Sequence, residues 1–87
     1  MERVIIVGAS GQARVVIDIF ELSGRYEVVG LVDGHVPAGT LVLGRPVLGS
    51  DRELTRIAAE TAATHYFVAV GDNHVRGLIA ARVASES

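Results

Sequence analysis

The sequence contains no cysteine and no lysine, and each of these two absences excludes a class of protein. Without cysteine the chain has no disulfide framework, no thiolate zinc site and no cysteine nucleophile. Without lysine it cannot bind phosphate as a P-loop NTPase does. All eight basic residues are arginines and no two are adjacent, so the basic patch of a nucleic-acid-binding protein is missing.

Long hydrophobic runs are also missing. The longest apolar runs are four or five residues, whereas a transmembrane helix needs roughly 20. The first residues do not follow the order of charged region, apolar region and cleavage site that defines a signal peptide. We therefore expect a cytoplasmic protein with no membrane partner and no nucleic-acid partner.

The residues that are present favour one small globular domain spanning residues 1–87. Hydrophobic residues make up 49% of the chain, yet only two Phe and two Tyr are among them. A core rich in Val, Ile, Leu and Ala is typical of a parallel sheet that is buried on both faces.

The hydrophobic pattern alternates between strands and helices. Apolar runs predict strands over 3–7, 27–33 and 65–70, and a short edge strand or loose hairpin within 40–49. Stripes of apolar residues predict a helix from Gln12 to Ser23 and another over about 51–62, and the second begins with a capping box of Ser50 and Glu53. The stripe of the first helix is Val15, Val16, Ile19 and Phe20, and that of a third helix near the end is Val75, Leu78, Ile79 and Val83.

This order predicts an α/β fold, a small Rossmann-like doubly wound parallel sheet of about four strands flanked by three helices. The simplest strand order is 3-2-1-4, with the short strand after Thr40 as strand 3. The carboxyl ends of strands 1 and 4 then form the switch point at which such sheets bind ligands.

The turn after the first strand is the first wall of this expected crevice. Gly8, Ser10, Gly11 and Gln12 lie in the run Gly8-Ala9-Ser10-Gly11-Gln12-Ala13. Small residues between a strand and a helix expose backbone N–H groups to a phosphate. Ser10 replaces the second glycine of a dinucleotide fingerprint. The glycines are equally explained by a tight strand-to-helix connection.

Two further loops complete the crevice. Asp33 and Gly34 end the second strand, where an acid binds a ribose hydroxyl or a base, or simply forms a turn. Gly71, Asp72 and Asn73 follow the last strand, and the two polar residues are equally good helix N-caps. Arg76, one turn later, is suited to pair with a phosphate or to remain solvated.

No complete catalytic constellation is present in the chain. The three histidines have no metal-ligand spacing, so we expect no metal site and no catalytic residue. His35 is expected to be solvent-exposed in a loop and His65 to be peripheral. His74 alone follows the crevice loop. The sequence therefore predicts a binding module.

Four segments in order resemble a known family. They are Gly8 to Asp18, Gly30 to Asp33, Pro46 to Gly49, and Val68 to Asn73 followed by Arg76. Nearly the whole chain resembles the N-terminal domain of bacterial sugar O-/N-acyltransferases of the sialic acid O-acetyltransferase and PglD type. Those proteins join a small Rossmann-like domain to a left-handed β-helix of hexapeptide repeats.

The resemblance implies a role in acceptor binding. Ser10, Gly11 and Gln12 would contact the phosphates or sugar of a nucleotide-sugar, Asp33 and Gly34 its uracil or ribose end, and Gly71 the same crevice. Acetyl-CoA would bind between the β-helices of a homotrimer, and this domain itself would hold no cofactor. The hexapeptide repeats are absent, so we expect a truncated domain whose parent is the enzyme.

Two residues differ from the family's usual pattern. Gln12 stands where the family commonly has a histidine, and an amide carries no charge and does not titrate. Gly34 stands where a second aspartate is usual. Two alternatives therefore remain beside the acetyltransferase domain: an NAD(P)-binding regulatory or redox domain, and a structural domain with an empty crevice.

Overall fold

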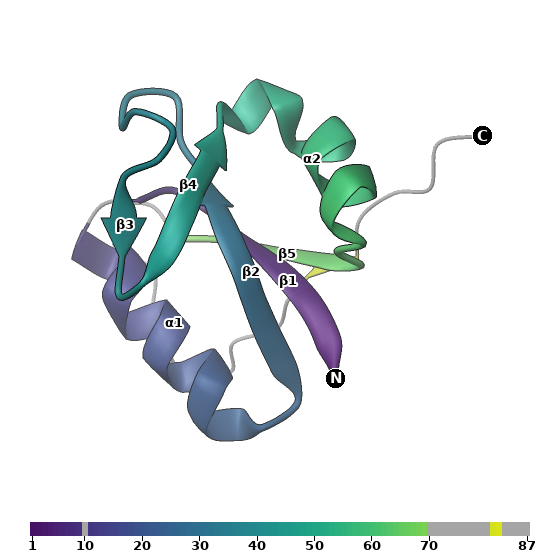
Figure 1. Cartoon of the computed structure of the whole chain (residues 1–87). Coiled ribbons are helices and arrows are strands. Elements are labelled where there is room, and N and C mark those ends of the chain that lie inside the picture. Colours follow the sequence, from purple (N-terminus) through teal and green to yellow (C-terminus); the bar gives the residue numbers. More distant parts are fainter. Residues whose placement is uncertain (10, 70–80, 83–87) are drawn as a thin grey trace.

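The computed structural model describes residues 1–9, 11–69 and 81–82 as an α/β domain (Figure 1). The elements in chain order are β1 (Glu2–Val7), α1 (Gly11–Ser23), β2 (Tyr26–Val32), β3 (Leu41–Val42), β4 (Arg45–Gly49), the 3-10 helix η1 (Asp51–Glu53), α2 (Leu54–Thr61), β5 (His65–Val68) and β6 (Ala81–Arg82). Within these ranges no helix has the length and hydrophobicity needed to cross a membrane.

One sheet in the order β3-β4-β2-β1-β5-β6 forms the centre of the domain. β4, β2, β1 and β5 run parallel to one another, which confirms the predicted order 3-2-1-4. β3 pairs antiparallel with β4, so the piece expected as an edge strand or loose hairpin is a hairpin. The four parallel strands all end at the same edge of the sheet.

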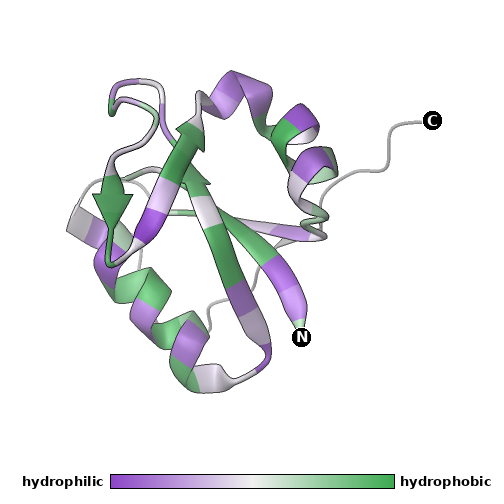
Figure 2. Ribbon diagram, viewed as in Figure 1, coloured by the Kyte–Doolittle hydropathy of each residue, from purple (hydrophilic) through white to green (hydrophobic). Residues whose placement is uncertain are grey.

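The sheet is covered on both faces, with α1 on one side and α2 on the other (Figure 1). Neighbouring residues of β1 point to opposite faces. Val4 and Ile6 belong to the core under α1, and Ile5 belongs to the core under α2. Green hydrophobic bands on the strands and on the sheet-facing sides of both helices mark these two cores in Figure 2. The doubly wound α/β prediction is therefore confirmed.

The buried stripe of α1 differs in part from the prediction. Val16 and Phe20 are buried as expected, but Val15 is 44% exposed and Ile17 is fully buried. The helix is rotated so that Ala13, Val16, Ile17 and Phe20, at spacings of three and four, face the sheet. Either stripe satisfies the helical period, and packing against β2 decides between them.

The predicted capping box at the start of the second helix is confirmed. The Ser50 hydroxyl accepts from the Arg52 N–H at 3.2 Å, and the Glu53 carboxylate accepts from the Ser50 N–H at 3.0 Å. These bonds satisfy donors that the first turn leaves without an intrahelical partner. The first turn is the 3-10 helix η1, and α2 ends at Thr61 and is capped by Ala62, whose φ of 60° is left-handed.

The chain after β5 differs from the prediction where it is described. Ala81 and Arg82 form β6 and pair antiparallel with Tyr66 and His65 of β5, so the predicted helix is wrong at these two residues. Edge pairing of β5 outweighs the local helical period, because propensity is a weak influence beside tertiary contacts. The rest of that predicted helix lies outside the described residues.

Candidate functional site

The carboxyl ends of the parallel strands are joined by backbone hydrogen bonds that run across the sheet. The Ala69 N–H donates to the Val7 carbonyl at 2.7 Å, and the Gly8 N–H donates to the Val32 carbonyl at 2.8 Å. On the other side of β2 the Asp33 N–H donates to the Gly49 carbonyl at 2.9 Å. The loops after β5, β1, β2 and β4 therefore begin side by side, which is where doubly wound sheets bind ligands.

Asp33 connects two of these loops through its carboxylate. Oδ2 accepts from the Ala9 N–H at 2.8 Å, and Oδ1 accepts from the His35 and Val36 N–H groups at 2.7 and 2.9 Å. These three backbone donors, with that of Val36 first, hold the pKa of Asp33 below its usual value. The side chain therefore fixes the first turn against the loop that follows β2.

The first turn has the shape that the sequence predicts where it is described. Gly8 has a φ of 108°, a region that residues with a side chain rarely adopt. Gly11 is the first residue of α1, and a Cβ placed there meets no atom of the described residues within 4 Å. Gln12 is half-buried. No described residue therefore covers the start of α1 on the side of Gly11, where a ligand could approach the backbone.

Several predicted site residues lie outside the described residues. Ser10 is one of them in the first turn. The others belong to the loop after β5 and the segment that follows it: Gly71, Asp72, Asn73, His74 and Arg76.

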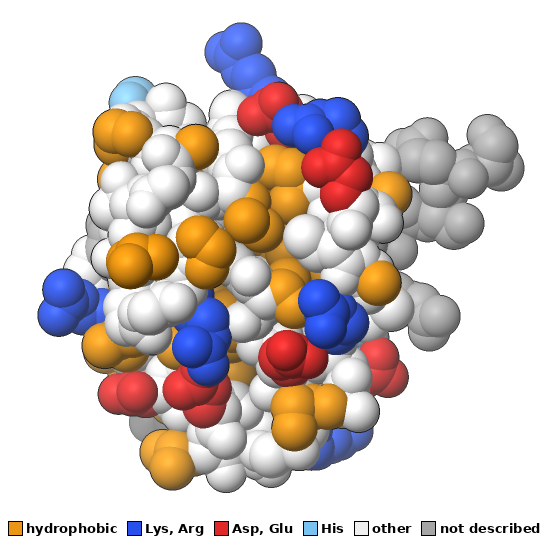
Figure 3. Space-filling model, viewed as in Figure 1, with side chains coloured by type: hydrophobic (Ala, Val, Ile, Leu, Met, Phe, Trp, Pro, Cys, Tyr) orange, Lys and Arg blue, Asp and Glu red, His pale blue; other side chains and the backbone are white. Residues whose placement is uncertain are grey.

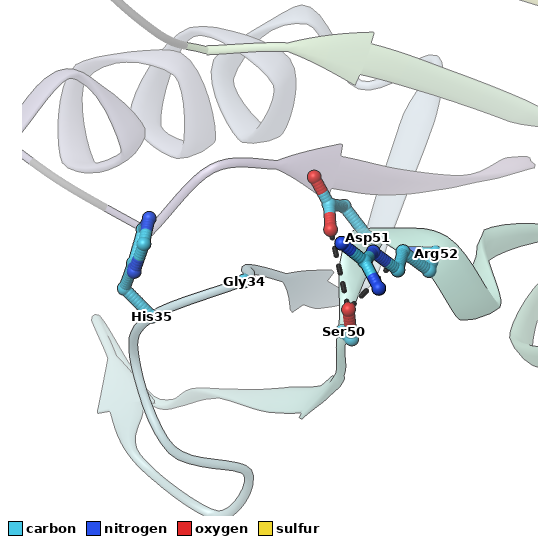
Figure 4. A pocket seen from close by; sticks show the side chains of 5 residues that line it. All are labelled: Gly34, His35, Ser50, Asp51 and Arg52. Carbon is cyan, nitrogen blue, oxygen red and sulfur yellow. Dashed lines mark hydrogen bonds between the residues drawn. The ribbon is translucent and has the colours of Figure 1, made fainter.

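A polar pocket opens beside Asp33, between the loops after β2 and β4. It has a volume of about 480 Å³ and is lined by Gly34, His35, Ser50, Asp51 and Arg52. In Figure 4 the His35 ring stands on one side of Gly34, and the Ser50-Asp51-Arg52 segment stands on the other. The volume falls within the range of about 300–1,000 Å³ that is usual for small-molecule sites.

Gly34 is the predicted site residue that lines this pocket. His35 is exposed, as expected, and it also forms one wall. Sequence reasoning missed the other three residues, because Ser50-Asp51-Arg52 was explained as the start of a helix. The predicted strand order already set β4 beside β2, but it did not give the register, in which Val32 lies opposite Gly49 and residue 34 comes next to residues 50–52.

Several charged side chains of the domain are paired with a side chain of opposite sign, but the two that line the pocket, Asp51 and Arg52, are in none of the described ion pairs. Figure 3 shows basic groups lying against acidic ones on this face of the molecule, which gives no large field of one sign there. The described ion pairs between carboxylates and arginines are Arg3–Glu27, Arg45–Glu21, Arg56–Glu53 and Arg56–Glu60. Arg52 has no ion-pair partner among the described residues, so its guanidinium is available to a ligand.

Glu53, at the start of α2, has a lowered pKa. The Ser50 N–H and the Arg56 guanidinium both lower the pKa of Glu53, the N–H more strongly. Asp51 differs from Glu53, because its recorded side-chain hydrogen bond is a single one, from the Ser50 hydroxyl to Oδ1 at 3.2 Å. In the described part of the chain no three His, Asp or Glu residues lie close enough to hold a metal ion.

These features define a small doubly wound α/β domain with a polar pocket at the carboxyl ends of its strands. The model of one family, the PglD N-terminal domain, matches residues 3–83. The chain belongs to this family, and the resemblance inferred from its sequence segments is confirmed.

A solved structure supports this assignment. The chain is similar to a histidine-to-asparagine mutant of perosamine N-acetyltransferase from Caulobacter crescentus, which was solved in complex with CoA and GDP-perosamine. The two are 36% identical with a TM-score of 0.68 over 83% of this chain. The match covers 32% of the acetyltransferase, so this chain spans about a third of that protein's length. No curated protein matches the chain.

Proposed function

We propose that this chain is the acceptor-binding domain of an acetyl-CoA-dependent sugar acetyltransferase, and that it holds a nucleotide-sugar at the carboxyl edge of its sheet. The observation that carries the proposal is the polar pocket between the β2 and β4 loops, at the same edge of the sheet as the turn that Asp33 holds through the Ala9 N–H. Membership of the PglD N-terminal domain family supports it. The similar acetyltransferase was solved with CoA and with a nucleotide-sugar.

The residues divide between the two ends of the ligand. The backbone of Gly8, Ser10 and Gly11 and the amide of Gln12 would bind the phosphates or the sugar, because the N-terminus of a helix attracts anions. The loop of Asp33 and Gly34 would hold the nucleoside. Gly71, Asp72, Asn73 and Arg76 would line the opposite wall.

The acyl transfer itself would take place outside this chain. The catalytic base and the acetyl-CoA site belong to a β-helix domain in this proposal, and a homotrimer of the parent protein would bring that domain to the acceptor. The present domain would position the sugar amine or hydroxyl and would bind no cofactor.

A thermal-shift panel tests this proposal. UDP- and GDP-sugars should raise the melting temperature, because a ligand that binds only the folded state stabilises it by mass action. CMP-sialic acid serves as a further nucleotide-sugar, and acetyl-CoA should have no effect on this domain. A shift with NAD but with none of the nucleotide-sugars would contradict the proposal and favour a dinucleotide-binding domain.

A Gly11→Val variant tests the position of the ligand. A Cβ at this position meets no described atom within 4 Å, so the fold should persist, but the methyl groups of valine should block the approach to the start of α1. We expect the ligand-induced thermal shift to disappear while the melting temperature of the free protein changes little. The control is Ala59→Val, which places the same valine side chain at an exposed position of α2, away from the first turn. An unchanged ligand affinity in Gly11→Val would argue against this crevice.

A further inference from the structure

We infer that Asp51 and Arg52 select the base of the nucleotide-sugar and favour guanine over uracil. This inference rests on the proposed function and adds the identity of the base to it. It follows from which polar groups of the pocket are already used by the protein and which remain open to a ligand.

Asp33 is poorly suited to read a base. Its Oδ1 accepts two backbone hydrogen bonds and its Oδ2 accepts a third. A carboxylate has about four acceptor positions, so only one remains, on Oδ2. That position cannot take two neighbouring N–H groups of a base, because such a pair needs both oxygens. The group that discriminates between bases must therefore lie elsewhere in the pocket.

Asp51 has the acceptor positions that Asp33 lacks. Its recorded hydrogen bond is the one from the Ser50 hydroxyl to Oδ1, and no bond to Oδ2 is recorded among the described residues. Asp51 is exposed and lines the pocket, and Figure 4 shows its carboxylate beside Arg52. A full negative charge and an adjacent guanidinium free of ion pairs thus face the same space.

This pair of groups matches one edge of guanine. Guanine presents two adjacent donors, N1–H and the 2-amino group, followed by the O6 acceptor. A carboxylate accepts both donors side by side, and an arginine donates to O6, which is its usual partner on this base. Uracil presents one N–H between two carbonyl oxygens, so a carboxylate that approaches it meets a repelling oxygen. Charge and hydrogen bonding therefore both favour guanine.

The remaining walls fit a flat bicyclic ring. The pocket volume of about 480 Å³ leaves room for a purine with part of its ribose. The planar imidazole of His35 stands across Gly34 from Asp51, where it faces the space that a base would fill (Figure 4). Gly34 itself adds no side chain between them. The similar acetyltransferase, solved with GDP-perosamine, carries the same base on its nucleotide.

The test is a titration of the protein with GDP, UDP and XDP, the xanthine analogue, by isothermal calorimetry. We expect GDP to bind at least about tenfold more tightly than UDP, as the loss of a charge-assisted pair implies. Asp51→Asn should weaken GDP binding by about 10- to 100-fold. The same variant should gain affinity for XDP, because the asparagine amide donates to the carbonyl that replaces the 2-amino group.

The matched control is Asp18→Asn, which removes one carboxylate from the exposed side of α1. It should leave all three affinities unchanged. The capping box does not use the Asp51 carboxylate, so Asp51→Asn should keep the wild-type melting temperature. UDP binding as tight as GDP binding, or an Asp51→Asn variant without the switch toward XDP, would overturn this inference and leave the proposed function standing. Failure of every nucleotide to bind would overturn both.

Discussion

An Asp33→Asn variant should lose about 2 kcal/mol of unfolding free energy at neutral pH, and its ligand affinity should fall with it. The carboxylate accepts three backbone N–H groups from both sides of the crevice. An asparagine oxygen can still accept from the His35 and Val36 N–H groups. Its NH2 group would then face the Ala9 N–H, and two donors would oppose each other. The first turn would lose its attachment to the β2 loop.

The pH dependence of this loss identifies its cause. The pKa of Asp33 is lowered in the folded state, so its stabilisation is fully present above the unfolded value of about 3.9 and is lost as the pH falls through the folded pKa. The difference between the wild type and Asp33→Asn should be constant above about pH 5 and should shrink below about pH 4. Urea denaturation at pH 3, 4, 5 and 7 measures it.

The control for this series is again Asp18→Asn, whose carboxylate makes no hydrogen bond or ion pair recorded within the described residues. Its unfolding free energy should stay within about 0.5 kcal/mol of the wild type across the series. A loss in Asp33→Asn that is independent of pH would contradict the role given to the carboxylate and would point to altered packing instead.

A Gly30→Ala variant should lose about 2 kcal/mol, a large part of the stability of a domain of this size. Gly30 is buried in β2, and a Cβ there would lie 2.5 Å from Leu48 Cδ1 and 2.9 Å from the Pro46 carbonyl oxygen. Both distances are far below van der Waals contact. The β2–β4 register shifts between Leu31 and Val32, which pair with Val47 and Gly49. Leu48 is therefore left without a partner on β2, and its side chain lies against Gly30.

Thermal or urea denaturation measures the loss of unfolding free energy. A second substitution shows how much of that loss comes from the contact with Leu48 and how much from the Pro46 carbonyl. Leu48→Ala removes the side chain that clashes but leaves the Pro46 carbonyl in place. The double variant should therefore recover part of the loss relative to the sum of the two single variants. Gly11→Ala is the control, because a Cβ at that position meets no described atom within 4 Å. A Gly30→Ala variant as stable as the wild type would show that β4 moves aside freely.

The same variant links the core to the site. Leu48 precedes Gly49 and Ser50, so a displaced β4 would carry Ser50-Asp51-Arg52 away from Gly34. Nucleotide affinity should therefore fall together with stability in Gly30→Ala, even though Gly30 is buried and does not line the pocket.

The sequence alone was enough to predict the four parallel strands, the first two helices and the order of those strands, but not β6, where it predicted a helix. Several of these predictions depend on residues no more than four positions apart. They are the β-branched run of β1, the capping box of Ser50 and Glu53, and the end of α1 at Ser23. Gly8 lies in the strand-to-helix turn that the sequence predicts, and it has the positive φ that glycine adopts most readily. Four ordered sequence segments indicated the family.

Other features depended on contacts between distant residues. Packing against the sheet decides which face of α1 is buried. Pairing with β5 likewise decides that Ala81 and Arg82 form a strand. The bond from Ala9 to Asp33 spans 24 positions of the chain. The pocket exists because β2 and β4 are paired, which joins Gly34 and His35 to residues 50–52. Periodicity and turn chemistry act over a few residues, whereas strand pairing decides which loops lie side by side. The contacts between those loops in turn decide which polar groups remain available to a ligand.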